Sequence, residues 1–158
     1  MTRPREAAAC SPAPGFVDDY LAYLLARASH RVSAGFHAEV AAAGLSVLEW
    51  RVLACLAGGQ SRSVGELCDI VLAQQPTLTK LLGRMEQQGL VRRRTGTRDR
   101  RRTAVTLTAQ GQRMATPLLL RARAHEARVL ADMGAAHGMQ LKHLLRQLVE
   151  SDLTAPSR

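Results

Sequence analysis

Cysteine, lysine and aromatic residues are scarce in this chain of 158 residues. Its three cysteines, Cys10, Cys55 and Cys68, form no C-x-x-C pair, which argues against a disulfide framework or a zinc site and indicates reduced thiols in the cytoplasm. No run is long and apolar enough to span a bilayer, and no signal peptide is recognisable before the first expected helix. The sequence also has no nucleophile–base pair, glycine-rich phosphate loop or metal-ligand cluster, so we expect no enzyme, no metal and no cofactor.

The shortage of lysine contrasts with an abundance of arginine. All but two of the 22 basic residues are arginines, and the formal net charge is +9. A guanidinium group binds phosphate or guanine through two parallel hydrogen bonds, although a GC-rich genome would produce the same bias. This balance predicts a polyanionic partner, either nucleic acid or an anionic membrane surface.

The basic residues concentrate between residues 91 and 103, where the sequence VRRRTGTRDRRRT holds seven arginines and one acid, Asp99. Thr-Gly-Thr interrupts the run, which indicates strand, turn and strand rather than a disordered basic tail. We expect the arms of a β-hairpin at 90–94 and 103–107, with its tip near Asp99. A basic hairpin, unlike a basic amphipathic helix, favours nucleic acid over a membrane as the partner.

Two capping boxes precede the hairpin. Ser46 with Glu49 predicts the start of a helix that ends near residue 57, and Ser63 with Glu66 predicts the start of another that ends near residue 71. In each box the serine accepts from a backbone N–H three residues on, and the glutamate reaches back to the serine N–H.

A further helix is predicted to begin at Pro76 and to end at Gly89. Together with the helix before it, this segment forms a predicted helix-turn-helix whose polar face suits a DNA major groove. The hairpin behind it is the wing. The residues that we expect to contact DNA are Gln74, Gln75, Thr77, Thr79, Lys80, Arg84, Arg94, Arg98, Asp99, Arg100 and Arg101.

The first and last helical segments have more apolar surface than one small core needs. Residues 16–43 are predicted to form one helix of roughly 40 Å, ended by Gly44. Thr108 caps another helix, which Pro117 should kink or end. Gly134 and Gly138 bracket a break before the last, amphipathic helix. The surplus predicts a homodimer, with an interface at Phe16, Tyr20, Leu141, Leu144, Leu145 and Leu148.

The expected fold is mainly α with a small β-wing: a winged helix-turn-helix whose N- and C-terminal helices form a dimerisation domain. Its parts are a flexible N-terminal arm at 1–15, a helical dimerisation region at 16–44 and 109–150, a DNA-binding lobe at 45–108 and a C-terminal tail at 151–158.

Three strings point to a known family: LSVLEWRVLACLA, PTLTKLLGRMEQQGLVRR and RDRRRTAVTLTAQG. With the order of the helices and the wing, they make the chain resemble the MarR (multiple antibiotic resistance regulator) family from about Phe16 to Glu150. The resemblance implies a homodimeric transcription regulator, most often a repressor, released from a pseudo-palindromic operator by a small aromatic acid or phenol.

The resemblance also implies roles within the wing. Asp99 and Arg101 match a D-x-R element that stabilises the wing, and Arg98 would enter the minor groove of DNA. The chain departs from many members at Gly96, where they carry an aspartate, and this loss of an acid predicts a looser tip that binds DNA less selectively.

The family's effector pocket lies between the dimerisation helices and the DNA-binding lobe. The matching region offers an aromatic wall with arginine and histidine donors, which suits an anionic aromatic ligand. The candidate residues are Tyr23, Arg27, His30, His37, Trp50 and Arg51. Taken singly, Trp50 also fits an ordinary core position and Arg27 a solvent-facing one.

Two alternatives stay open at this point. The arginine density also suits a sequence-tolerant architectural DNA-binding protein without an effector. Some family members sense peroxide through a cysteine near the first helix, and Cys10 lies near it but has no evident activating base. Cys55 and Cys68 fall in apolar helical patterns and are expected in the core.

Overall fold

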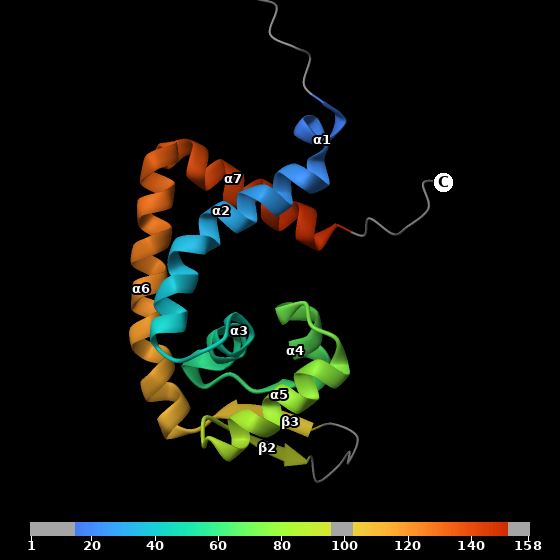
Figure 1. The fold of residues 1–158 in the computed structure, drawn as a ribbon, viewed down its shortest axis with the longest axis vertical. Coiled ribbons are helices and arrows are strands. Elements are labelled where there is room, and N and C mark those ends of the chain that lie inside the picture. Colours follow the sequence, from blue (N-terminus) through green and yellow to red (C-terminus); the bar gives the residue numbers. More distant parts are fainter. Residues whose placement is uncertain (1–14, 96–102, 152–158) are drawn as a thin grey trace, which may run out of the picture. The chain divides into compact units, whose positions relative to one another are not determined.

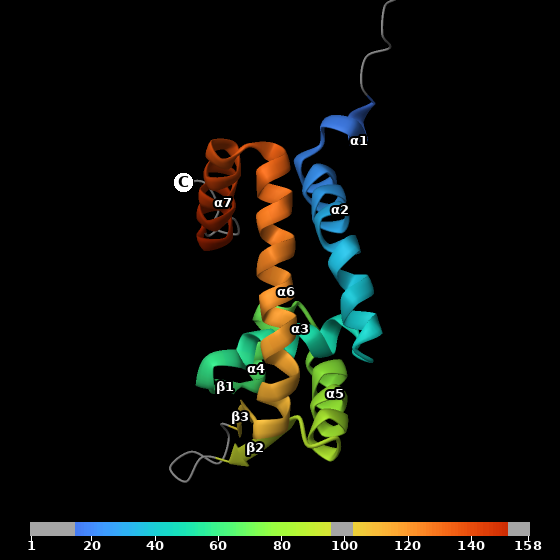
Figure 2. The ribbon, with the colours of Figure 1, turned by 90° about the vertical axis from the view of Figure 1, so that its left-hand side faces the viewer.

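The computed structural model describes residues 15–95 and 103–151 (Figures 1 and 2). Its helices are α1 (Phe16–Asp19), α2 (Leu21–Ala42), α3 (Val47–Leu56), α4 (Val64–Val71), α5 (Gln75–Gln87), α6 (Ala109–Met133) and α7 (Ala135–Glu150), with a 3-10 turn, η1 (Ala57–Gly59). Its strands are β1 (Arg62–Ser63), β2 (Val91–Thr95) and β3 (Thr103–Leu107). The mainly helical fold with a small β-sheet is as the sequence predicts. The chain divides into two compact units, residues 1–35 and 36–158.

In the first unit, the prediction of one unbroken helix over 16–43 is wrong. Tyr20 has an extended backbone (φ −78°, ψ 117°) and separates α1 from α2. Asp18 and Asp19 immediately precede the break, and aspartate favours helix ends over helix interiors because its carboxylate competes for backbone N–H groups. The Asp18 carboxylate accepts from the Gly15 N–H at 3.1 Å. The Phe16 and Tyr20 rings stack across this turn, with their centroids 5.0 Å apart.

The second unit contains the hydrophobic core. Buried aliphatic side chains from the end of α2, from α3 to α6 and from β2 and β3 form one cluster. The largest fully buried members are Val40, Val52, Leu53, Leu56, Leu67, Val71, Leu78, Leu82, Met85, Val91 and Val105. Both predicted capping boxes are confirmed: Ser46 and Ser63 accept from the N–H groups of Glu49 and Glu66, whose carboxylates accept in return.

The wing is an antiparallel sheet with the strand order β1-β3-β2. Val91 pairs with Leu107 and Thr95 with Thr103, so the two predicted arms are confirmed within a residue. The third strand, β1, in which Arg62 pairs with Val105, was not predicted from the sequence. A strand of two residues is too short to show the alternation of apolar and polar residues that identifies strands in a sequence. It is a strand only because it pairs with β3.

Two predictions about the last helices need correction. α6 continues through Pro117, so the helix does not end there, although proline removes the hydrogen bond to the Arg113 carbonyl. Buried Ala115 and Leu118 on either side hold the helix against the core, which offsets that loss. Gly138 lies inside α7, where a Cβ would approach the Leu130 Cδ2 to 2.8 Å, so it permits close packing against α6 and does not mark the break.

No single helix among the described residues has both the length and the apolar run needed to cross a bilayer, although α2 and the segment from α3 to η1 meet that criterion together.

Candidate nucleic-acid interface

The helix-turn-helix consists of α4, the turn 72–74 and α5. Leu72 adopts the left-handed conformation (φ 57°, ψ 49°), and its N–H donates to the Cys68 carbonyl at the end of α4. α5 begins at Gln75, one residue earlier than predicted, with Pro76 in its first turn, where its missing N–H costs no helical hydrogen bond.

The two faces of α5 differ sharply. Leu78, Leu81, Leu82 and Met85 are buried in the core. The predicted DNA contacts on and before this helix are all exposed: Gln74, Gln75, Thr77, Thr79, Lys80 and Arg84. Thr77, Lys80 and Arg84 line a shallow hollow with Ser46, so this polar face has two cationic side chains within one depression.

The three consecutive arginines of β2 have different partners. Arg92 donates through Nε to the Thr106 hydroxyl at 3.2 Å. Arg93 forms an ion pair with Glu86, with 2.6 Å between its Nη2 and the carboxylate. Arg94 is exposed and has neither hydrogen bond nor ion pair with the described residues, so its guanidinium is available to a phosphate. The predicted contacts Arg98, Asp99, Arg100 and Arg101 lie outside the described residues.

Glu86 links α5, the recognition helix of the helix-turn-helix, to the wing. Hydrogen bonds from the Arg93 side chain and backbone, and the nearby guanidinium charge, lower the pKa of the Glu86 carboxyl below its usual range. This pair could not be predicted from the sequence, because its partners are seven residues apart on different elements. Their separation matches neither the i, i+3 nor the i, i+4 spacing of a helical pair.

The wing is also fixed to α6. Thr108 caps that helix by accepting from the Gly111 N–H at 3.0 Å, and its hydroxyl donates to the Gly89 carbonyl. The backbone of Gly111 passes so close to Leu90 that a Cβ would lie 2.0 Å from the Leu90 carbonyl oxygen. Residues 107–111 (LTAQG), which belong to one of the family-like strings, therefore have a structural explanation. The threonine caps α6, and no other residue can replace the glycine without rearrangement.

The six candidate effector residues fall in both units. In the first, the Arg27 Cζ lies 5.7 Å from the centroid of the Tyr23 ring, a cation–π contact on one face of α2. Arg27 and His30 line a hollow of about 430 Å³ together with Ala26 and Arg31. The structure thus brings Tyr23, Arg27 and His30 to neighbouring turns of one helix.

In the second unit, Trp50 packs edge-on against buried Phe36, with centroids 5.2 Å apart, and belongs to the margin of the core. His37 is half-buried. Arg51 donates to the Val71 carbonyl at 3.3 Å and so joins α3 to the end of α4.

The described cysteines, Cys55 and Cys68, were expected in the core, and the structure places them half-buried at its margin. Burial raises the pKa of the Cys55 thiol, and the opposing effect of the Arg62 charge is smaller. A thiol with a raised pKa holds little of the reactive thiolate at neutral pH, which disfavours Cys55 as a redox sensor. Cys10 lies outside the described residues.

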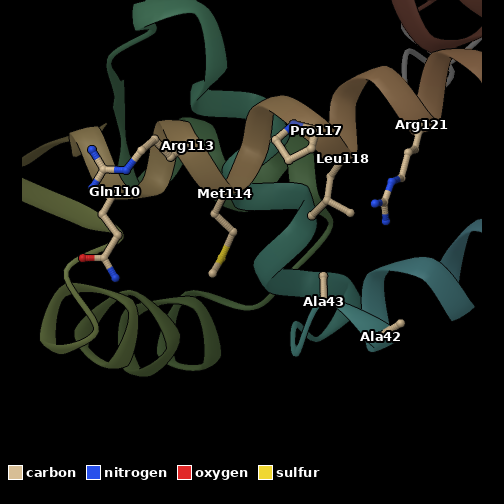
Figure 3. Close-up of a pocket in the computed structure, with 8 residues that line it drawn as sticks. All are labelled: Ala42, Ala43, Gln110, Arg113, Met114, Pro117, Leu118 and Arg121. Atoms are coloured by element: carbon tan, nitrogen blue, oxygen red, sulfur yellow. The ribbon is translucent and has the colours of Figure 1, made fainter.

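A further hollow, of about 550 Å³, was not anticipated from the sequence (Figure 3). It lies between the first half of α6 and the end of α2. The residues that line it are Ala42, Ala43, Gln110, Arg113, Met114, Pro117, Leu118 and Arg121. The lining residues on α6 are spaced by three and four, so they share one face of the helix. That pattern does not predict a hollow, because arginine at such positions is equally typical of a solvated helix face.

The model of the MarR family matches residues 43–102, which include the helix-turn-helix and the first wing strand. A crystal structure of a MarR family transcriptional regulator from Silicibacter pomeroyi DSS-3 is 38% identical, with a TM-score of 0.79 over 87% of this chain and 98% of that chain. The HTH-type transcriptional repressor Rv2887 of Mycobacterium tuberculosis is 32% identical over 139 residues, 85% of this chain and 97% of the relative.

The crystal structure of that Mycobacterium tuberculosis protein in complex with salicylic acid is 29% identical, with a TM-score of 0.66 over 83% of this chain and 97% of that chain. The similarity extends over both the DNA-binding lobe and the long helices around it. The chain belongs to the MarR family and is a transcriptional regulator rather than an enzyme.

Proposed function

We propose that the chain is a homodimeric repressor that leaves a pseudo-palindromic operator when a small aromatic acid binds. The observation that supports DNA binding is the exposed polar face of α5, which lies beside the arginine-rich strand β2. The ion pair between Glu86 and Arg93 joins this helix to that strand. In this proposal residues 45–108 bind DNA, and residues 16–44 and 109–150 form the dimer.

On DNA, each α5 lies in a major groove with Lys80 and Arg84 near base edges or phosphates. The wings reach the flanking minor grooves, where Arg98 responds to groove width. Two copies of α5 related by a twofold axis require half-sites about one helical turn, ~10 bp, apart.

Exposed apolar side chains on the terminal helices support the dimer. Phe16 is 79% exposed and Tyr20 50%, while Leu141 and Leu144 on α7 are 38% and 52% exposed. Leu145 and Leu148, also on α7, are half-buried. Large apolar groups in contact with water favour association, because each buried side chain contributes roughly 1.5–3 kcal/mol.

An aromatic acid is the proposed effector because Tyr23, Arg27, His30, His37, Trp50 and Arg51 offer ring faces and cationic donors. The relative of known structure with salicylic acid bound supports the same ligand class. The acid acts by binding one conformation of the dimer better than the other and so shifting the spacing of the two recognition helices.

Fluorescence anisotropy tests the proposal, with DNA from upstream of the chain's own gene, a random duplex as competitor, and a panel of aromatic acids. Tight, selective binding that one acid abolishes is the expected result. Lys80→Ala should weaken operator binding, whereas Arg128→Ala, a matched cation on α6, should not. Equal affinity for both duplexes, unchanged by any acid, would instead support a sequence-tolerant architectural protein.

A further inference from the structure

Two adjoining hollows form a groove beside the first half of α6, which begins next to the wing and passes α3 (Figure 2). One, of about 530 Å³, lies between η1, the wing sheet and the start of α6. The other, of about 400 Å³, lies between the end of α3 and the following turns of α6. Gly58 and Gln112 line both hollows, which together are called the α3–α6 groove below.

The α3–α6 groove lies on a face of α6 different from that of the hollow in Figure 3, and the two share no lining residue. Its lining residues on α6 include Gln112, Thr116, Leu119 and Arg123, whose spacing of three and four places them on one side of the helix. None of the proposed DNA contacts, effector residues or dimer contacts lines the groove. The proposed function therefore leaves this surface without a role.

The middle of the groove is apolar and open. Leu120 is 61% exposed, and Leu119 beside it packs partly against the core. The opposite wall, from α3, has only the small side chains of Ala54 and Ala57. At Gly58 an added Cβ would meet no described atom within 4 Å. The groove therefore has room for apolar side chains that would cover Leu120.

The two ends of the groove are cationic. Arg92 lies at the wing end, where its Nε donates to the Thr106 hydroxyl, and Arg123 lies at the other end. Arg123 has neither hydrogen bond nor ion pair with the described residues, and the Glu126 carboxylate one turn further on α6 is paired with Lys142 at 2.9 Å. Among the described residues that line the groove, none is acidic, so its charge is positive and uncompensated.

The length of the groove limits what can bind to both ends at once. From Ala109 to Arg123, α6 rises by about 21 Å at about 1.5 Å per residue. An extended chain spans this distance with about six residues, at roughly 3.3–3.6 Å each. A small anion would reach only one of the two arginines, and a DNA duplex would offer phosphates but no aliphatic side chain to Leu120.

We propose that the α3–α6 groove binds an extended acidic segment of a partner protein, with apolar side chains at its centre and carboxylates at both ends. The carboxylates accept from Arg92 and Arg123 in charge-assisted hydrogen bonds. The central side chains pack on Leu119 and Leu120. This binding requires neither operator DNA nor an effector, so it does not depend on the proposed function.

Titration of the full chain, labelled for amide correlation spectra and free of DNA, tests the proposal. The probe is a capped hexapeptide with two leucines flanked on each side by two glutamates. Control peptides carry lysine in place of glutamate or alanine in place of leucine. The groove variants are Arg123→Gln and Leu120→Ser, both at exposed positions. Their matched controls are Arg128→Gln, at another exposed arginine of α6, and Leu72→Ser, at a leucine that is 84% exposed.

The acidic peptide should shift the amide signals of Gly58, Gly59 and Thr116. Arg123→Gln and Leu120→Ser should each weaken its binding by about three- to fivefold, and both controls should retain it. The two control peptides should bind at least about tenfold more weakly than the acidic peptide.

Absence of binding to the wild-type protein, affinity unchanged in both groove variants, or equal losses in the groove and control variants would each overturn the proposal. A random duplex that shifts the same amide signals and displaces the peptide would overturn it too, because the groove would then bind nucleic acid. If the peptide binds as expected while the protein fails to bind its upstream DNA, the proposed function fails and this surface stands.

Discussion

Glu86 and Arg93 form a three-contact pair that joins the end of the recognition helix to the first strand of the wing. The Glu86 carboxylate accepts from the Arg93 Nε at 2.8 Å and from its backbone N–H at 3.0 Å, and Arg93 Nη2 lies 2.6 Å from it. The Arg93 guanidinium therefore has a structural role. These contacts hold the start of β2 against the C-terminal part of α5.

Glu86→Gln should lower the free energy of unfolding at pH 7 by about 0.5–1 kcal/mol, since both partners are about one-third exposed and water screens the pair. Because the folded state lowers the pKa of Glu86, its contribution is present above the ordinary carboxyl pKa of about 4.3 and is lost as pH falls through the lowered value. Urea unfolding at pH 7 and in acid should therefore show the difference between wild type and variant shrinking in acid. A difference that stays constant with pH would contradict the assigned cause.

Much of the fold could be predicted because its signals are local. Ser46 and Glu49, three residues apart, determine a helix start through hydrogen bonds that depend on no other part of the chain. The break at Tyr20 and the continuity through Pro117 could not be predicted in the same way. For Pro117, packing of Ala115 and Leu118 on the core outweighs the local preference of proline.

The candidate site likewise has features that a local sequence pattern predicts and features that depend on distant residues. The exposure of Lys80 and Arg84 follows from the apolar spacing of α5, which the sequence displays directly. Partners that are distant in the sequence leave no such pattern. The hydrogen bond from the Arg51 guanidinium to the Val71 carbonyl, twenty residues away, is an example.

Gly111→Ala should destabilise the protein severely, by roughly 3 kcal/mol or more, because the new Cβ would collide with the Leu90 backbone carbonyl, which cannot rotate away as a side chain would. Gly83→Ala is the matched control. Gly83 lies inside α5 with open space around its Cβ position, so alanine there should stabilise by about 0.5–1 kcal/mol. Thermal and urea unfolding measure both, and equal effects of the two substitutions would refute the close-approach explanation.

Leu72→Gly should raise the free energy of unfolding by up to about 1 kcal/mol. A leucine in the left-handed conformation destabilises the folded state by roughly 1–2 kcal/mol, and glycine removes this strain. Part of the gain is offset because glycine also raises the backbone entropy of the unfolded chain. The Leu72 side chain is 84% exposed, so its removal sacrifices little packing. Leu72→Ala retains the strain and should leave stability nearly unchanged. If alanine stabilises as much as glycine, the gain comes from removing exposed apolar surface and not from the backbone.

Arg93→Gln should mainly lower stability and Arg94→Gln should mainly lower DNA affinity, although the two residues are adjacent on β2. Arg93→Gln removes the Glu86 partner and should reproduce the stability loss of Glu86→Gln, with a smaller effect on DNA affinity. Arg94 has no partner among the described residues, so Arg94→Gln should leave stability unchanged while weakening DNA binding. If Arg94 contacts one phosphate, the slope of log affinity against log salt concentration should become shallower by about 0.9. Anisotropy titrations over a salt series, paired with urea unfolding, measure both quantities. An unchanged slope for Arg94→Gln would place that guanidinium away from the phosphates and leave DNA contact by the wing to its other arginines.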